Sequence, residues 1–200
     1  MHRRYAAAAF AACAGFSMVE TSAVLAGTTL LTASAAPQIK EYVESARQVK
    51  ASGDVKVIAG SIIRLAWNVG KIGRHQRPPP AMLVGAGETP QATTPETNPW
   101  TLAVGVGPVQ RLEAHLVDNA AGYTVEGGDG VRWRGPYLEG LSADPWGWRY
   151  AVNVGLIEER GGRAVVVISA GPNGTVETPY NMVGLRIGGD DVIGLIGSGR

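Results

Sequence analysis

The residue with the most unusual chemistry in this sequence is Glu20. It lies in a weakly apolar stretch from Phe16 to about Pro37, in which 12 of 22 residues are apolar and eight are Ser, Thr or Glu. A stretch of this length can cross a bilayer as a helix, which needs about 20 residues. A carboxylate inside such a helix costs about 2.5 kcal/mol or more, so it normally has a partner. If the chain is cut between Gly15 and Phe16, the new amine lies one helical turn before Glu20 and is a suitable partner.

The segment that precedes this stretch has the composition of a leader. Residues 1–15 carry two early arginines, contain no acid and end in glycine. Counted from Phe16, Glu20 is the fifth residue and Pro37 the twenty-second. In these positions the sequence resembles the type IV pilin and pseudopilin family. Precursors of that family have a basic leader that ends in glycine, then phenylalanine, a glutamate as the fifth mature residue and often a proline as the twenty-second.

The resemblance implies processing followed by assembly. A membrane prepilin peptidase would cut between Gly15 and Phe16 and methylate the Phe16 amine. Residues 16–37 would then be a transmembrane and assembly helix, rich in the small and hydroxylated residues that suit close helix packing in lipid. Glu20 and Pro37 are the predicted assembly residues, with Glu20 neutralising the amine of a neighbouring subunit. The implied location is the bacterial inner membrane, as a single-pass protein with a cytoplasmic N-terminus and a periplasmic C-terminal domain.

Two other interpretations of the N-terminal segment remain open. Basic residues before an apolar run also fit an ordinary secretory signal, for which Ala33-Ser34-Ala35 offers a cleavage site. Cys13 ends a segment that faintly resembles a lipoprotein cleavage box. Either interpretation would make the chain a secreted or lipid-anchored periplasmic binding module without a filament role, and neither explains Glu20.

Residues 38–72 are expected to continue the helix as an amphipathic segment. They contain no proline, and their apolar residues recur at spacings of three and four, as one face of a helix requires. Gly53 and Gly60 each weaken a helix by about 1 kcal/mol relative to alanine, so a bend or break is expected near Ser52-Gly53. In the pilin family, one long helix lies half in the membrane and half against a sheet.

Residues 73–100 differ in character, with three consecutive prolines at Pro78-Pro79-Pro80 and further glycines and prolines. This composition predicts a loop or disordered insertion, stiffened locally by proline. Such segments serve as linkers more often than as recognition sites for a partner.

The remaining residues, 101–200, are expected to form a C-terminal α+β domain. A short helix is expected within 109–121, and strands are expected in 149–154 and 164–168 with Gly161-Gly162 as a hairpin turn between them. Shorter strands are expected within 184–196. A helix packed on a small antiparallel sheet is the fold class that follows, and it agrees with the pilin-like resemblance.

A tight turn is predicted at Asp144-Pro145-Trp146-Gly147. Asp suits the first position of a type I turn, Pro the second and Gly the fourth. Together with Tyr137-Leu138 before it and Tyr150 after it, the turn resembles the C-terminal domain of the major pseudopilins of type II secretion systems. The resemblance implies that assembly of the subunit drives protein secretion, with other pseudopilins and the inner-membrane assembly platform as partners.

Two glycine-containing motifs near the C-terminus, at residues 169–174 and 189–193, resemble the closing loops of the same pseudopilins and suggest a cation site. Asn173 and the pair Asp190-Asp191 supply oxygen ligands of the kind that calcium prefers, and Ser169 opens the first of the two loops. In the resembled family this loop binds calcium, commonly with aspartate where this chain has Asn173. Glycine loops with turn-forming Asn and Asp also occur without a metal, so both interpretations stay open.

The sequence does not predict an enzyme. His2, His75 and His115 are isolated, without metal-ligand spacing, and no nucleophile elbow, phosphate-loop lysine or catalytic cysteine pattern is present. The single cysteine excludes an intrachain disulfide. The formal net charge of +1 gives no broad attraction to nucleic acid. Only 18% of residues are charged and 28 are glycines, which favours turns and loops over a helical bundle.

Overall fold

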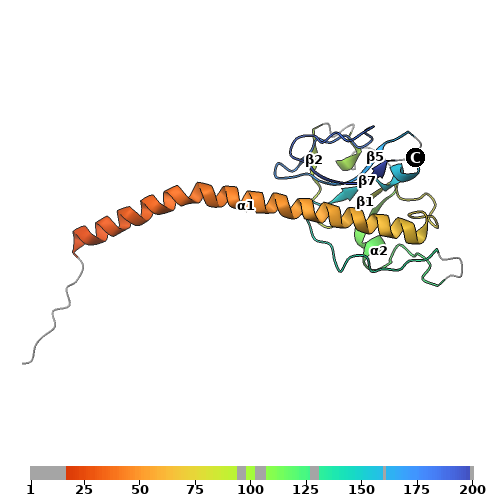
Figure 1. The fold of residues 1–200 in the computed structure, drawn as a ribbon, viewed down its shortest axis with the longest axis horizontal. Coiled ribbons are helices and arrows are strands. Elements are labelled where there is room, and N and C mark those ends of the chain that lie inside the picture. Colours follow the sequence, from red (N-terminus) through yellow and green to blue (C-terminus); the bar gives the residue numbers. More distant parts are fainter. Residues whose placement is uncertain (1–16, 94–97, 102–106, 127–130, 160, 199–200) are drawn as a thin grey trace, which may run out of the picture. The chain divides into compact units, whose positions relative to one another are not determined.

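The computed structural model describes residues 17–93, 98–101, 107–126, 131–159 and 161–198 (Figure 1). The chain divides into two units, residues 1–44 and residues 45–200. The second unit therefore takes in residues 45–72 of the expected amphipathic helix, the expected insertion and the C-terminal residues together. No boundary near residue 100 separates them.

The main helix, α1, runs from Met18 to Val69 and contains Pro37. In the first unit its described side chains are largely exposed, including those of Met18, Leu25 and Tyr42. Among the residues that the structure describes, no helix combines the length and the apolar character of a membrane span.

The prediction of a break near Ser52-Gly53 is wrong, because α1 continues through Gly53 and Gly60 without interruption. Ala51 and Val55, which flank this point, are completely buried. Burying such side chains contributes about 1.5–3 kcal/mol for a valine, which exceeds the cost of one helical glycine.

The second unit is built on a mostly antiparallel sheet of five strands, with the order β3-β1-β4-β5-β7. The α+β class and the helix-on-sheet arrangement are confirmed, although β1 and β3 pair in parallel. The strands are β1 (Met82–Val84), β3 (Val109–Arg111), β4 (Ala151–Val152), β5 (Ala164–Ser169) and β7 (Val192–Ser198). A second, two-stranded parallel sheet joins β2 (Gln91–Ala92) to β6 (Thr175–Val176).

Side chains alternate between the two faces of the five-stranded sheet. Leu83, Val152 and Val167 face the cluster that α1 completes, and their neighbours Met82, Ala151 and Ile168 face a second cluster around Trp100. All six residues of β5 are buried, as expected of a central strand with a continuous β-branched run.

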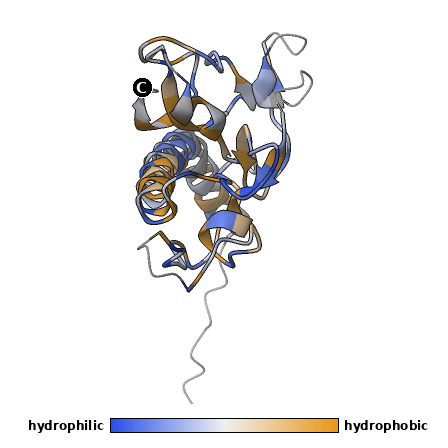
Figure 2. Cartoon of the chain, turned by 90° about the vertical axis from the view of Figure 1, so that its right-hand side faces the viewer, coloured by the Kyte–Doolittle hydropathy of each residue, from blue (hydrophilic) through white to orange (hydrophobic). Residues whose placement is uncertain are grey.

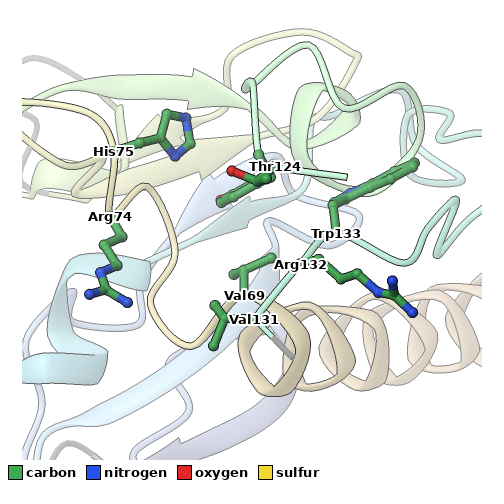
Figure 3. Close-up of a pocket in the computed structure, with 8 residues that line it drawn as sticks. Val69, Arg74, His75, Thr124, Val131, Arg132 and Trp133 are labelled. Atoms are coloured by element: carbon green, nitrogen blue, oxygen red, sulfur yellow. The ribbon is translucent and has the colours of Figure 1, made fainter. Parts of the chain in front are cut away.

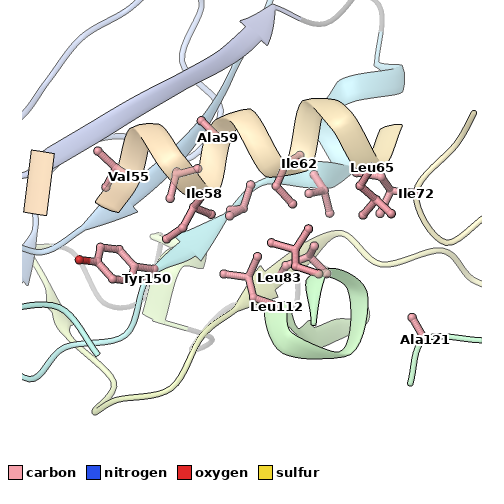
Figure 4. Close-up of a cluster of buried hydrophobic side chains, with 14 of the residues drawn as sticks. Val55, Ile58, Ala59, Ile62, Leu65, Ile72, Leu83, Leu112, Ala121 and Tyr150 are labelled. Atoms are coloured by element: carbon pink, nitrogen blue, oxygen red, sulfur yellow. The ribbon is translucent and has the colours of Figure 1, made fainter. Parts of the chain in front are cut away.

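The buried residues of α1 form a single stripe at spacings of three and four, and they pack on the sheet and on a short helix, α2 (Leu112–Leu116). Figure 4 shows this cluster, in which Ile58, Ile62 and Leu65 lie above Leu83 and Leu112. Hydrophobic residues are not confined to this stripe: both hydrophobic and hydrophilic segments appear around the turns of α1 in Figure 2, and Trp67 is 85% exposed.

The prediction of a structureless insertion at 73–100 is wrong. Its residues Met82 and Leu83 are completely buried in β1, which lies between β3 and β4. The same segment supplies β2, and the 3-10 helix η1 (Pro99–Thr101) begins within it. A strand of three residues flanked by prolines and glycines is too short to give a periodic signal. Its place depends on pairing with residues far away in the chain.

Two local predictions need adjustment. The helix expected within 109–121 is shorter, because Val109–Arg111 pairs as β3 before α2 begins. The connection from β4 to β5 is not a tight hairpin, because the 3-10 helix η2 (Val154–Glu158) fills much of it. Gly161 and Gly162 nevertheless have positive φ angles, as a turn there requires.

Candidate functional site

The start of α1 is closed by a capping box. The Ser17 amide donates a hydrogen bond to Glu20 Oε2 at 2.9 Å, and the Glu20 amide donates to Ser17 Oγ at 3.2 Å. This reciprocal pair satisfies two of the amides that a helix N-terminus leaves without intrahelical partners, and it places a negative charge at the positive end of the helix dipole. Glu20 therefore has a local role at the helix start.

The other predicted residues of this segment divide into two groups. Gly15 and Phe16, the expected processing pair, lie outside the described residues, as do the rest of the expected leader and Cys13. Pro37 is inside α1 and exposed.

The predicted turn at Asp144 is confirmed. The Gly147 amide donates to the Asp144 carbonyl at 3.0 Å, which closes the turn over Pro145 and Trp146. The Asp144 side chain adds bonds from the amides of Trp146 (3.0 Å) and Trp148 (2.8 Å) to its Oδ1. A buried carboxylate that accepts two amide hydrogen bonds fixes the turn firmly.

The second oxygen of Asp144 connects the turn to the end of β5. Ser169 Oγ donates to Asp144 Oδ2 at 2.5 Å and accepts a bond from the Gly171 amide at 3.2 Å. The hydroxyl of Ser169 thus links the Asp144 turn to the loop after β5 by hydrogen bonds to Asp144 and Gly171. Ser169 and Asp144 lie 25 residues apart in the chain, and no spacing rule predicts their contact.

The remaining three candidate ligands lie on two adjoining loops, one after β5 and one before β7. The Asn173 amide donates to Asp190 Oδ2 at 3.2 Å. Asp191 Oδ2 accepts bonds from the amides of Glu177 (2.9 Å) and Thr178 (2.6 Å). A hydrogen bond between the loops thus brings Asn173 to Asp190, whereas Asp191 bonds to the amides of Glu177 and Thr178 and not to Asn173.

Glu177 is a further member of this cluster that the sequence analysis missed. Its Oε2 accepts a bond from Asn173 Nδ2 at 3.5 Å, and its carboxylate lies so close to Gly189 that a Cβ on that residue would overlap it. Gly171 is required in the same place, since it has a φ of 66° and a Cβ there would lie 2.4 Å from the Asp190 carbonyl oxygen. The glycines allow the two loops to approach each other.

The cluster is rich in oxygens without hydrogen-bond partners. Asp190 Oδ1 and Asp191 Oδ1 are both buried and unbonded. Burial raises the pKa of the Asp191 carboxyl. The hydrogen bonds from Thr178 and Glu177 favour its charged form and offset part of this rise. Within the described ranges, no three His, Cys, Asp or Glu side chains are placed to share one metal ion. Calcium, however, also takes amide and backbone carbonyl oxygens and water as ligands, so the oxygen donor set suits that ion.

No protein family, no curated protein and no solved structure matches this chain.

The signals for the missed residues differ in strength. Ser17 followed three residues later by Glu20, before an apolar run, is a readable capping box. Glu177 has no comparable signal, because its place depends on the contact between two loops that meet only in the folded chain.

Proposed function

We propose that this chain is a pilin-like subunit that is cleaved between Gly15 and Phe16, methylated at Phe16 by a prepilin peptidase, and assembled with further copies into a pseudopilus. The observation that carries the proposal is the division of α1. From Ala51 on, the helix buries one stripe in a folded α+β unit, whereas earlier in α1 the apolar side chains of Met18, Val19, Val24, Leu25, Ile39 and Tyr42 are exposed. Exposed apolar side chains spread along one helix are of the kind that lipid or further helices cover.

The hydroxyl groups of this helix are compatible with such surroundings. Thr21, Ser22, Thr28 and Thr29 each donate a hydrogen bond to a backbone carbonyl three or four residues earlier in α1. Because each of these donors is already bonded within the helix, burying it costs less than its polarity suggests. Small hydroxylated residues also permit close approach of neighbouring helices.

The capping box leaves Glu20 able to serve a neighbouring subunit. Among the described residues, Glu20 accepts a hydrogen bond at Oε2 from the Ser17 amide, which leaves Oε1 for a second donor. In the proposed filament that donor is the methylated Phe16 amine of an adjacent copy, which gives the buried carboxylate a charged partner.

The substitution Glu20→Gln tests this pairing, because the amide oxygen can still cap the helix while the charge is removed. Co-expressed with a prepilin peptidase, the variant should be cleaved and reach the membrane at the normal level. Its incorporation into filaments, measured by shearing and immunoblotting, should fall by at least tenfold. Glu41→Gln, which neutralises another exposed carboxylate of α1, is the matched control. Normal incorporation of Glu20→Gln would exclude the pairing.

We further propose that the subunit serves a type II secretion system and that a calcium ion stabilises its C-terminal loops. The support is the Asp144 turn together with the buried, unbonded Oδ1 atoms of Asp190 and Asp191 and the adjoining loop that carries Asn173. Bound there, the ion would supply positive charge to an acidic cluster and hold the two loops together. The partners in this role are further pseudopilins and the inner-membrane assembly platform.

A further inference from the structure

A pocket of about 340 Å³ lies beside the C-terminal end of α1, within the second unit. Figure 3 shows it between the segment after α1, which carries Arg74 and His75, and the extended segment that carries Val131, Arg132 and Trp133. Its volume falls within the range of small-molecule sites, about 300–1,000 Å³. The proposed filament role makes no use of this pocket.

Two aromatic side chains of the pocket are held in place by hydrogen bonds. The Tyr123 hydroxyl accepts a bond from the Gly73 amide at 3.0 Å and lies 2.6 Å from His115 Nδ1. Trp133 Nε1 donates to the His115 carbonyl at 3.0 Å, and the Trp133 amide donates to Thr124 at 2.8 Å. The rings are therefore ordered before a ligand arrives, which lowers the entropic cost of binding.

The remaining lining combines polar residues, His75 and Thr124, with two valines and with two arginines at the rim. Val69 and Val131 supply the aliphatic wall. Arg74 and Arg132 lie on opposite sides of the pocket in Figure 3, with their guanidinium groups directed away from each other. Both are exposed, and neither guanidinium has an ion-pair partner among the described residues. None of the described lining residues carries a carboxylate. The pocket thus joins an aromatic and aliphatic interior to an uncompensated positive rim.

We propose that this pocket binds a small organic anion in which one carboxylate is joined to an aromatic ring by a short aliphatic chain. The ring packs against Tyr123 and Trp133, and the carboxylate stays at the rim, where a long arginine side chain can turn toward it. An aromatic pair contributes about 0.5–1.5 kcal/mol beyond the area it buries, and guanidinium is the cation that matches a carboxylate best.

The test is isothermal titration of the full chain with 3-phenylpropionate, compared with its neutral amide and with propionate. The acid should bind at least threefold more tightly than either analogue, because only the acid has both the ring and the charge. Raising the salt concentration should weaken its binding, since the rim arginines are exposed. The indole N–H resonance of Trp133, assigned by Trp133→Phe, should shift on binding. Equal affinity for acid and amide, or no shift at the Trp133 resonance, would overturn the proposal.

Two substitutions locate the charge. Arg74→Gln and Arg132→Gln should each weaken 3-phenylpropionate binding roughly threefold, as expected for exposed charge pairs, and leave the amide unaffected. Arg186→Gln, which removes an exposed arginine outside the pocket, should change neither affinity. If the double variant Arg74→Gln, Arg132→Gln binds the acid as tightly as the original chain, these arginines do not bind the carboxylate and the proposal is contradicted.

Discussion

His115 illustrates how a residue without a catalytic partner can still set a property of the protein. It is completely buried, and its Nε2 lies 2.8 Å from Gln110 Oε1 while its Nδ1 lies 2.6 Å from the Tyr123 hydroxyl. Because the Gln110 amide oxygen can only accept, the proton of the neutral imidazole is at Nε2, and the Tyr123 hydroxyl donates to Nδ1. Burial, with a smaller contribution from the charge of His75, lowers the pKa of His115 to about 4.

The lowered pKa predicts a loss of stability in mild acid. Between the unfolded pKa of about 6.5 and the folded value of about 4, the unfolded chain takes up a proton that the folded chain refuses. The free energy of unfolding should therefore fall, by about 3 kcal/mol from this residue, as the pH drops through that interval. Urea unfolding of the full chain and of His115→Gln at pH 7 and pH 4 measures it. The substituted chain should lose about 3 kcal/mol less than the original, and parallel losses would exclude His115 as the source.

Asp191 differs from His115, because its carboxylate holds two buried amides and yet keeps one oxygen without a partner. Asp191→Asn retains a carbonyl oxygen for the amides of Glu177 and Thr178, so it should cost less than about 1 kcal/mol. Asp191→Ala leaves both amides unsatisfied and should cost about 2–4 kcal/mol. Thermal melts of the two variants test this difference.

The Asp191→Asn variant also separates the structural role of Asp191 from its proposed role in calcium binding. Calcium should raise the melting temperature of the original chain, and Asp191→Asn should abolish most of that rise because the loop loses a negative ligand. An equal rise in both chains would remove Asp191 from the site, and no rise in the original chain would refute calcium binding while leaving the filament proposal intact.

At the scale of the elements, α1 and β5 were predictable because each carries its own signal. The three- and four-residue spacings after residue 38 and the β-branched run of Ala164–Ser169 are readable locally. β1 was missed because three residues have no period, and a helix break was wrongly expected because glycine propensity was weighed without the packing that opposes it. The Asp144 turn was predictable from residue types, whereas the bonds from Ser169 to Asp144 and from Asn173 to Glu177 depend on loops brought together by the sheet.

Two glycines distinguish helix propensity from helix packing. A Cβ at Gly53 would meet nothing within 4 Å, so Gly53→Ala should stabilise the chain by about 0.5–1 kcal/mol. A Cβ at Gly194 in β7 would lie 2.5 Å from the Val55 carbonyl oxygen of α1, so Gly194→Ala should destabilise it by about 1–3 kcal/mol. Urea unfolding of both variants provides the comparison. A tolerated alanine at Gly194 would contradict the close contact of α1 with the sheet.

At the scale of the whole molecule, the α+β class with a long N-terminal helix followed from sequence, and the structure adds a second unit that begins at Ser45. The sequence could not predict that boundary, because it lies inside a continuous helix and is set by where packing begins. The proposed processing pair precedes the described residues, so the filament role depends on chemistry at Gly15 and Phe16 that is best measured directly.

The central claim is that the chain is cut after Gly15 and methylated before assembly. Intact-mass and N-terminal peptide mass spectrometry of the protein, expressed in a bacterium with an active prepilin peptidase, tests it. We expect a chain that starts at Phe16 and carries one additional methyl group, and the uncut chain when Gly15 is replaced by a bulky residue. A mature chain that starts near Ala36, or one that is lipidated at Cys13, would contradict the account.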